Sequence, residues 1–213
     1  MKRLLRNMLE KDKILAANVL AAVIIKGIAL IVSLLATPAY IRFFDNESVL
    51  GVWFTILSVL SWILTFDFGI GNGLRNHLVK ALESNNKKDI KGYISSSFVS
   101  NGILTCALIL ISILIVRHID LNWFFNVSHD MVSSDKLMLA VVITLIGVGM
   151  RFFMTTVNSI FYALQKSSVN NFLALIASVL LLGFVFIAPG KTAEDKLVSM
   201  AIGYAALSNI PTI

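Results

Sequence analysis

Three ionisable side chains, Lys26, Asp67 and Arg151, lie within or at the edge of long apolar runs of this 213-residue sequence. A charge at the centre of a bilayer costs about 2.5 to 3.5 kcal/mol even on a lenient insertion scale, so such side chains usually face a cavity or reach back to the membrane surface. A helical rise of about 1.5 Å per residue places Lys26 roughly 18 Å, Arg151 roughly 9 Å and Asp67 roughly 3 Å from the predicted inner membrane edge. Lys26 and Arg151 are close enough in depth to contact one phosphate group. We therefore predict a cationic cavity lined by Lys26 and Arg151, with snorkelling to the headgroups as the alternative for each.

The segment 65–77 concentrates an acid, three glycines and an arginine where an apolar run gives way to a basic segment. These glycines do not match a dinucleotide-binding loop, because Leu74 occupies the position of the third required glycine and no alternating strand and helix pattern surrounds it. Gly69 and Gly73, four residues apart, instead favour close helix approach. Asp67 has two interpretations: an acid that fixes helix packing, or part of the inner opening of a substrate path.

The composition predicts an all-α, polytopic membrane protein. Hydrophobic residues make up 57% of the chain and charged residues 14%, with a mean hydropathy of +0.85. An average soluble domain is about one quarter charged, so the surplus apolar surface must face lipid. A membrane-spanning helix needs about 20 residues, and the apolar runs fit a six-helix bundle. The predicted spans are 14–40, 49–72, 93–116, 137–161, 171–188 and 197–213.

The distribution of basic residues predicts the orientation. Eleven Lys and Arg residues flank the side that holds the N-terminus, and five flank the other side. Because cytoplasmic loops carry the excess of basic residues, we expect a cytoplasmic N-terminus. The net charge of +6 does not indicate nucleic-acid binding, since the basic residues are divided among loops.

Catalytic and metal sites have little support in the sequence. His77 is predicted on the cytoplasmic side and His118 and His129 on the other, so the three histidines cannot share a metal ion. Cys106, the single cysteine, cannot form an internal disulfide or a thiolate metal site alone. We therefore expect no metal, no cofactor and no catalytic residue.

Three blocks of sequence carry a resemblance to a known family. They are Asp67-Phe68-Gly69-Ile70-Gly71-Asn72-Gly73-Leu74-Arg75-Asn76, Asp120-Leu121-Asn122-Trp123-Phe124-Phe125-Asn126-Val127 and Tyr162-Ala163-Leu164-Gln165. With these blocks and its hairpin spacing, the chain resembles the N-terminal half of the bacterial polysaccharide-biosynthesis flippases. These are the O-antigen translocases of the multidrug/oligosaccharidyl-lipid/polysaccharide exporter superfamily. The resemblance implies one six-helix lobe of a two-lobe transporter.

The resemblance also implies a function and a set of site residues. The chain would move an undecaprenyl-pyrophosphate-linked sugar unit between the leaflets of the bacterial inner membrane by alternating access. Lys26 and Arg151 would hold the pyrophosphate and acidic sugars, while Asp67, Asn72 and Arg75 would shape the cytoplasmic entrance. The expected partners are the lipid-linked oligosaccharide, the bilayer, and either a C-terminal lobe or a second copy of the chain.

Two other functions stay open at this stage. A cation-coupled multidrug exporter of related fold requires a carboxylate within the membrane, and Asp67 is the only candidate. A membrane-bound sugar polymerase or acyltransferase requires clustered catalytic residues in a long outer loop, where His118 and His129 are almost the only candidates. The last predicted span is unfinished at Ile213, so we expect that the chain alone is not a complete transporter.

Overall fold

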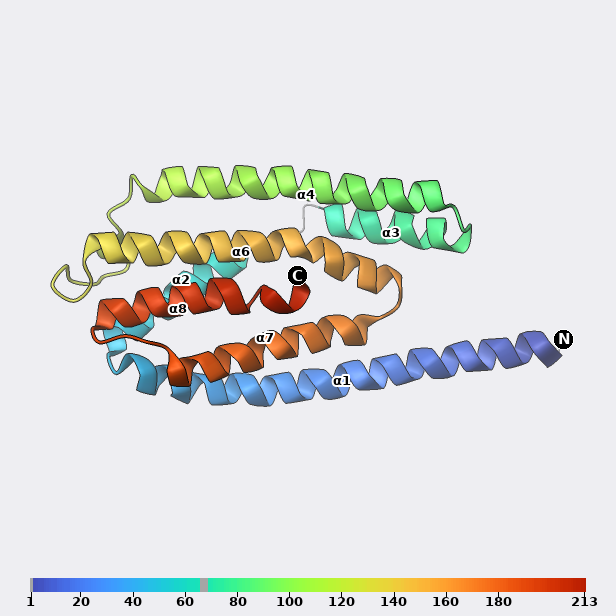
Figure 1. Cartoon of the computed structure of the whole chain (residues 1–213), viewed down its shortest axis with the longest axis horizontal. Coiled ribbons are helices and arrows are strands. Elements are labelled where there is room, and N and C mark those ends of the chain that lie inside the picture. The colour runs from blue at the N-terminus through green and yellow to red at the C-terminus, as the bar shows by residue number, and fades with distance from the viewer. Residues whose placement is uncertain (1, 66–68) are drawn as a thin grey trace.

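The computed structural model describes the backbone of residues 2–65 and 69–213, and all regular structure in these ranges is helical. The helices lie roughly along one common axis, with the N-terminus far out at one end (Figure 1). This confirms the predicted all-α class. In chain order the elements are α1 (Lys2–Phe44), α2 (Glu47–Ile63), α3 (Ile70–Glu83), α4 (Lys87–Val116), α5 (Leu121–Phe124), α6 (Ser134–Ala163), α7 (Ser167–Ile187), α8 (Ala193–Leu207) and the 3-10 helix η1 (Ile210–Thr212).

Four helices in the described part of the chain are long and apolar enough to cross a membrane. They are the segment Ala16–Phe44 of α1, and α4, α6 and α7 in full. The helices in the second and sixth predicted spans are shorter, with 17 residues in α2 and 15 in α8. The membrane-spanning character therefore rests on these four helices.

The second predicted span, 49–72, differs from the structure, because α2 ends at Ile63 and a separate helix, α3, begins at Ile70. Gly69 caps α3 with a left-handed backbone, φ +78°, which an L side chain rarely adopts. The helix α3 is amphipathic, with Leu74 and Leu78 buried on one face. It packs on α4 and α6.

The last predicted span also ends earlier than expected. The helix α8 stops at Leu207, and the chain continues into the short helix η1, which contains Pro211. A proline lacks the backbone N–H and its ring clashes with the carbonyl four residues earlier, here that of Leu207. Figure 1 shows this end of the chain lying between α6 and α7.

The helix α6 is the centre of the bundle. It contacts α2, α3, α4, α5, α7 and α8. In its most apolar stretch 44% of the residues are buried, compared with 17% in α7, 11% in α4 and none in α1. The other long helices therefore keep most of their apolar surface outward, as expected for contact with lipid.

Small residues let α8 approach α6 closely. A Cβ atom added at Gly147 of α6 would lie 2.6 Å from both Cα and Cβ of Ala205 in α8. Just past α8, the Asn209 side-chain amide donates hydrogen bonds to the carbonyls of Gly147, at 3.0 Å, and Ala205, at 2.8 Å. The end of α8 is thus held on α6 by backbone contact and by a buried amide.

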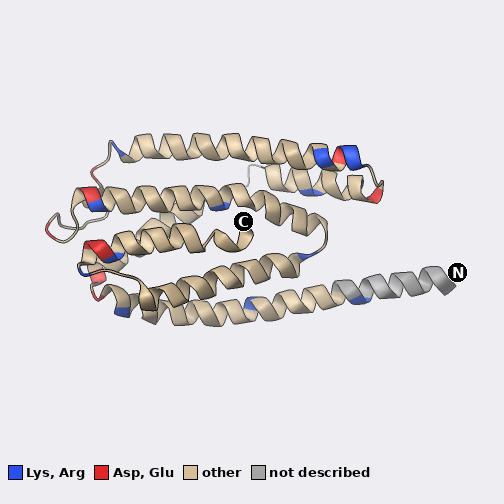
Figure 2. Cartoon of the chain, in the orientation of Figure 1, with Lys and Arg blue, Asp and Glu red and all other residues tan. Residues whose placement is uncertain are grey.

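Acids at the start of α8 hold the start of α6 at the end of the bundle opposite the N-terminus. The Glu194 carboxylate accepts from the backbone N–H of Ser133, at 3.1 Å, and from its hydroxyl, at 2.7 Å. Lys136 pairs with Asp195 at 3.2 Å. These hydrogen bonds from Ser133, the side-chain one foremost, hold the pKa of Glu194 below its ordinary value of 4.5. Figure 2 shows most of the charged residues near the two ends of the bundle, with isolated basic residues along α1 and α6.

The first prediction concerns helix packing. The substitution Gly147→Ala should lower the free energy of unfolding by about 1 to 3 kcal/mol, because the new Cβ must push the α8 backbone away. For a chain of this size, each kcal/mol lowers Tm by about 2 to 4 °C. Thermal unfolding in detergent measures the change. Gly183→Ala is the matched control, since an added Cβ there meets nothing within 4 Å, and an equal loss in both variants would contradict the prediction.

The second prediction concerns pH. The pKa of Glu194 is lower in the folded chain, so its contribution to stability is present above its unfolded pKa of 4.5 and is lost as the pH falls through the folded value. We therefore expect the start of α8 to exchange its amide hydrogens faster, relative to the intrinsic rate, as the pH falls below 4.5. Glu194→Gln should already open this segment at pH 7 and flatten its pH dependence. Glu83→Gln, at the other end of the bundle, should change neither, and an unchanged pH profile in Glu194→Gln would refute the assignment.

Candidate polar site in the membrane-spanning bundle

A small polar pocket lies between α6, α7 and the end of the chain. It has a volume of about 40 Å³, which is room for about three water-sized groups. Its polar lining comes from all three segments, with apolar side chains of α6 and α7 between them. The polar lining residues are Arg151, Asn158, Asn170, Ser208 and Thr212.

Helical spacing explains why these side chains meet. Arg151 and Asn158 are seven residues apart on α6, which is close to two turns and places them on one face. On α7 the same relation joins Asn170 to Ala177. The two helices are joined by a short turn at 164–166 and separate from there, and the end of the chain lies in the space between them (Figure 1).

Arg151 is the cation of this pocket. Its side chain is half-buried, and its Nη1 donates to the Ser208 carbonyl at 3.5 Å, the outer limit of a hydrogen bond. A guanidinium has five N–H donors, so most of its capacity is left for another acceptor. In a bundle of membrane-spanning helices, such a cation is suited to binding an anion.

Asn170 supplies an acceptor beside this cation. The residue is 8% exposed, and its side-chain N–H₂ donates to the Asn158 carbonyl at 2.9 Å. Its Oδ1 is buried and has no hydrogen-bond partner. A buried carbonyl without a partner costs free energy that a ligand hydroxyl could recover. The pocket therefore combines donors for an anion with an acceptor for an O–H group.

Lys26, the other predicted cavity residue, lies elsewhere. It is exposed on α1 and does not line the pocket. The helix α1 packs along α7, where the Asn171 amide donates to the Ala22 carbonyl at 3.1 Å. Because Asn170 faces the pocket and Asn171 faces α1, the helix α7 stands between Lys26 and Arg151.

The structure describes two of the three predicted entrance residues, Asn72 and Arg75. Asp67 lies outside the described residues. Asn72 is exposed on α3. The Arg75 guanidinium lies over the Tyr162 ring, 5.9 Å from its centroid, and so connects α3 to the end of α6. Neither Asn72 nor Arg75 lines the pocket around Arg151.

Asn101 shows the contrasting case of a buried polar residue that is fully used in packing. Its side-chain N–H₂ lies within hydrogen-bond distance of the carbonyls of Phe152 and Phe153, at 3.1 Å each, and of the Thr156 hydroxyl, at 2.9 Å. These bonds join α4 to α6.

Sequence reasoning found Arg151 but missed its neighbours. The available signal was Asn158, an asparagine within an apolar run, whereas Asn170 lies in the polar stretch before the predicted span 171–188. Nothing in the sequence shows that the two face each other. No group of His, Cys, Asp or Glu suited to a metal ion occurs in the described part of the chain. Comparison of the chain with family models, curated proteins and solved structures gives no match in any of the three.

The third prediction separates a site residue from a packing residue. Arg151→Met should leave Tm unchanged or raise it, because the single long hydrogen bond contributes little and a charge is removed from the bundle. Asn101→Leu should lower the free energy of unfolding by about 1 to 3 kcal/mol, because it leaves buried carbonyls without their donor. Thermal unfolding in the same detergent compares the two. A large loss in Arg151→Met would mean that Arg151 has a structural role.

Proposed function

We propose that the chain contributes one wall of a path that carries an anionic, lipid-linked saccharide across a membrane. The observation that carries this proposal is Arg151, a half-buried cation on the central apolar helix with one hydrogen bond of 3.5 Å. A charged side chain makes insertion of α6 into a membrane less favourable, and binding an anion there would offset that cost. The neighbouring acceptor, Asn170 Oδ1, favours a ligand that also carries hydroxyl groups.

The pocket fits part of such a ligand. A phosphate accepts hydrogen bonds from a guanidinium, often in pairs, and charge-assisted bonds are about twice as strong as neutral ones. The volume of about 40 Å³ admits a few atoms, so the pocket would hold one edge of the headgroup. The rest of the ligand would extend out of the pocket toward the other lobe or second copy of the chain, which would also cover Lys26. The proposal keeps what the resemblance to polysaccharide flippases implies, namely six spans in one lobe of a larger path, and the predicted location in the inner membrane with a cytoplasmic N-terminus.

The alternative of cation-coupled multidrug export has less support. It requires a carboxylate within the spans, and the acids of α4 and α6, Asp89 and Asp135, lie in the first helical turn. The segment Ala16–Phe44 and the helix α7 contain no Asp or Glu. Asp67 is the residue on which this alternative depends.

The fourth prediction tests the function in the cell that makes the protein. Replacing Arg151 by Gln in the gene should reduce surface polysaccharide about tenfold or more, because losing one charge-assisted contact costs about 1.5 to 3 kcal/mol. The lipid-linked saccharide should accumulate in the cytoplasmic leaflet. Lys26→Gln should reduce export less, since Lys26 does not line the pocket.

Arg42→Gln is the matched control. Arg42 is an exposed arginine in the last turn of α1, so its loss should leave export unchanged. Immunoblots of membrane fractions check that each variant reaches normal levels. Normal surface polysaccharide in cells carrying Arg151→Gln would overturn the proposed function.

A further inference from the structure

A larger apolar groove lies at the end of the bundle opposite the N-terminus. Its volume is about 360 Å³, within the range of about 300 to 1,000 Å³ that is usual for ligand pockets. Ser112 is its one polar lining residue, and α2, α4, α5 and α6 each contribute apolar ones. Residues that represent these four helices are Ile56, Leu60, Ile115, Leu121, Phe124 and Leu145.

This groove is open along one side. Its floor is buried, with Ile56 only 1% and Leu145 only 3% exposed. Its rim is exposed, with Trp62 at 70% and Ile115 at 54%. Trp62 is on α2 and Ile115 is on α4, so the opening lies between two helices on the side of the bundle. A groove that opens sideways in a membrane-spanning bundle is accessible to hydrocarbon chains.

A second, polar groove lies on the other side of α5. Its volume is about 610 Å³, and it is open to the surface. Apart from Val127, the lining side chains are an exposed indole, a carboxylate, two amides, a hydroxyl and an imidazole. They belong to Asp120, Asn122, Trp123, Asn126, Ser128 and His129.

The loop that forms this polar groove is held in place by buried contacts. The Asn122 amide donates to the Val132 carbonyl at 2.8 Å, and its oxygen accepts from the Ser134 hydroxyl at 2.8 Å. Leu121 and Val127 are packed into the main core. Such a loop presents fixed side chains to a ligand, which reduces the ordering cost of binding.

The composition of the polar groove favours a neutral saccharide over a phosphate. No Lys or Arg lines it, and the Asp120 carboxylate would repel an anion. Asp120 Oδ1 accepts from the Trp123 backbone N–H at 3.1 Å, and its Oδ2 takes no part in that bond. Carboxylates and amides pair with sugar hydroxyls, and an exposed indole offers a flat apolar face to the C–H face of a sugar ring.

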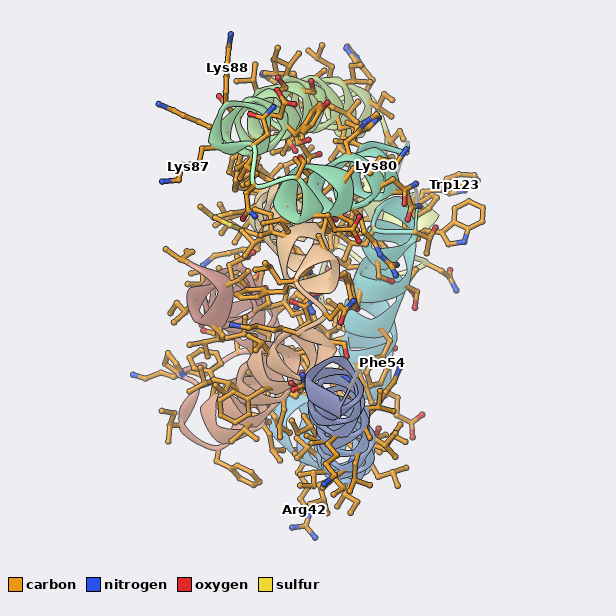
Figure 3. The ribbon with its side chains drawn as sticks, turned by 90° about the vertical axis from the view of Figure 1, so that its right-hand side faces the viewer. Arg42, Phe54, Lys80, Lys87, Lys88 and Trp123 are labelled. Atoms are coloured by element: carbon orange, nitrogen blue, oxygen red, sulfur yellow. The ribbon has the colours of Figure 1, made fainter. Side chains whose placement is uncertain are left out.

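The two grooves share α5 as a divider. Leu121 and Phe124 of α5 line the apolar groove, whereas Asn122 and Trp123 line the polar one. Figure 3 looks along the bundle axis and shows Trp123 projecting sideways from the bundle on the side of α2. Trp62 of α2 is on the rim of the apolar groove. A single amphiphilic molecule lying against this side could occupy both grooves.

We propose that these two grooves form one binding site for a glycolipid at the membrane surface opposite the N-terminus. The hydrocarbon chain lies between α2 and α4, and a neutral sugar of the headgroup stacks on Trp123 and bonds to Asp120 and His129. This inference deepens the proposed function and rests on it in taking the site as the place where the lipid-linked saccharide leaves the path. It involves neither Arg151 nor the pocket around it.

Two native tryptophans report on the two halves of the site. Trp62 lines the apolar groove and Trp123 the polar one, while Trp53 is fully buried in the core and gives a constant background. Trp62→Phe therefore isolates Trp123, and the difference between the native chain and Trp62→Phe gives the Trp62 signal with Trp123 in place. The probe is an alkyl maltoside with bromine atoms in its chain, added to the chain in lipid nanodiscs below its micelle concentration. The comparison compound is a polyethylene glycol ether with the same brominated chain.

We expect the maltoside to quench Trp62 with saturation at a concentration about tenfold lower than the ether requires, a difference of about 1.4 kcal/mol. The same concentration should shift the Trp123 emission, and free maltose should shift Trp123 alone. Equal quenching curves for maltoside and ether would mean that the groove merely holds bilayer chains. Quenching of Trp123 by brominated phospholipid, with no response to maltoside, would mean that it is only a membrane-surface anchor.

Variants that act on binding complete the test. Ser112→Phe fills the apolar groove and should raise the half-saturation concentration of the maltoside about tenfold. Ser178→Phe adds the same bulk to α7, outside the grooves, and should leave it unchanged. The assay measures equilibrium binding, so normal export in cells carrying Arg151→Gln together with tighter binding of the maltoside than of the ether refutes the proposed function alone. Loss of export in cells carrying Arg151→Gln together with equal maltoside and ether curves refutes the glycolipid site alone.

Discussion

The contact between α6 and α8 at Gly147 is the constraint on which the rest of the structure depends. The absence of a side chain at Gly147 lets the Ala205 backbone lie against α6, and Asn209 then reaches the Gly147 carbonyl at 3.0 Å. That hydrogen bond fixes the chain just where it leaves α8. It brings the carbonyl of Ser208 to Arg151 and directs η1 into the space between α6 and α7. The polar pocket exists because this close packing ends there.

Buried polar side chains in the bundle have two distinct uses. The Asn101 amide hydrogens all serve packing, since they meet acceptors on α6. The Arg151 guanidinium and the Asn170 carbonyl oxygen lie in one pocket and are left largely unsatisfied within the chain. Native bundles usually satisfy their buried polar groups, so unsatisfied groups of complementary character in one pocket indicate a ligand. Asn101 of α4 therefore serves helix packing, whereas Asn170 of α7 leaves its carbonyl oxygen to a ligand.

The sequence predicts the helical class and the long apolar helices well, because these depend on composition and run length. It also identifies Arg151, since a charge within an apolar run stands out. It does not predict the interruption before α3, where glycines permit two conformations and Gly69 adopts the left-handed one. It cannot place Lys26 relative to Arg151, because depth along the membrane normal says nothing of which helices are neighbours. The carbonyl that Arg151 contacts belongs to Ser208 at the end of α8, and the pocket around Arg151 is completed by α7 and η1. The packing of α8 on α6 brings these groups together.

Reactivity of a cysteine placed in the pocket tests the central claim most directly. The variant Thr212→Cys, in a Cys106→Ser background, puts a thiol in the lining of the pocket. An anionic sulfonate methanethiosulfonate should modify it faster than the cationic trimethylammonium reagent, because Arg151 attracts the anion. Inorganic pyrophosphate should slow the reaction, and Arg151→Gln should remove the preference. Equal rates for the two reagents, or a preference that persists in Arg151→Gln, would contradict a cationic pocket that binds anions.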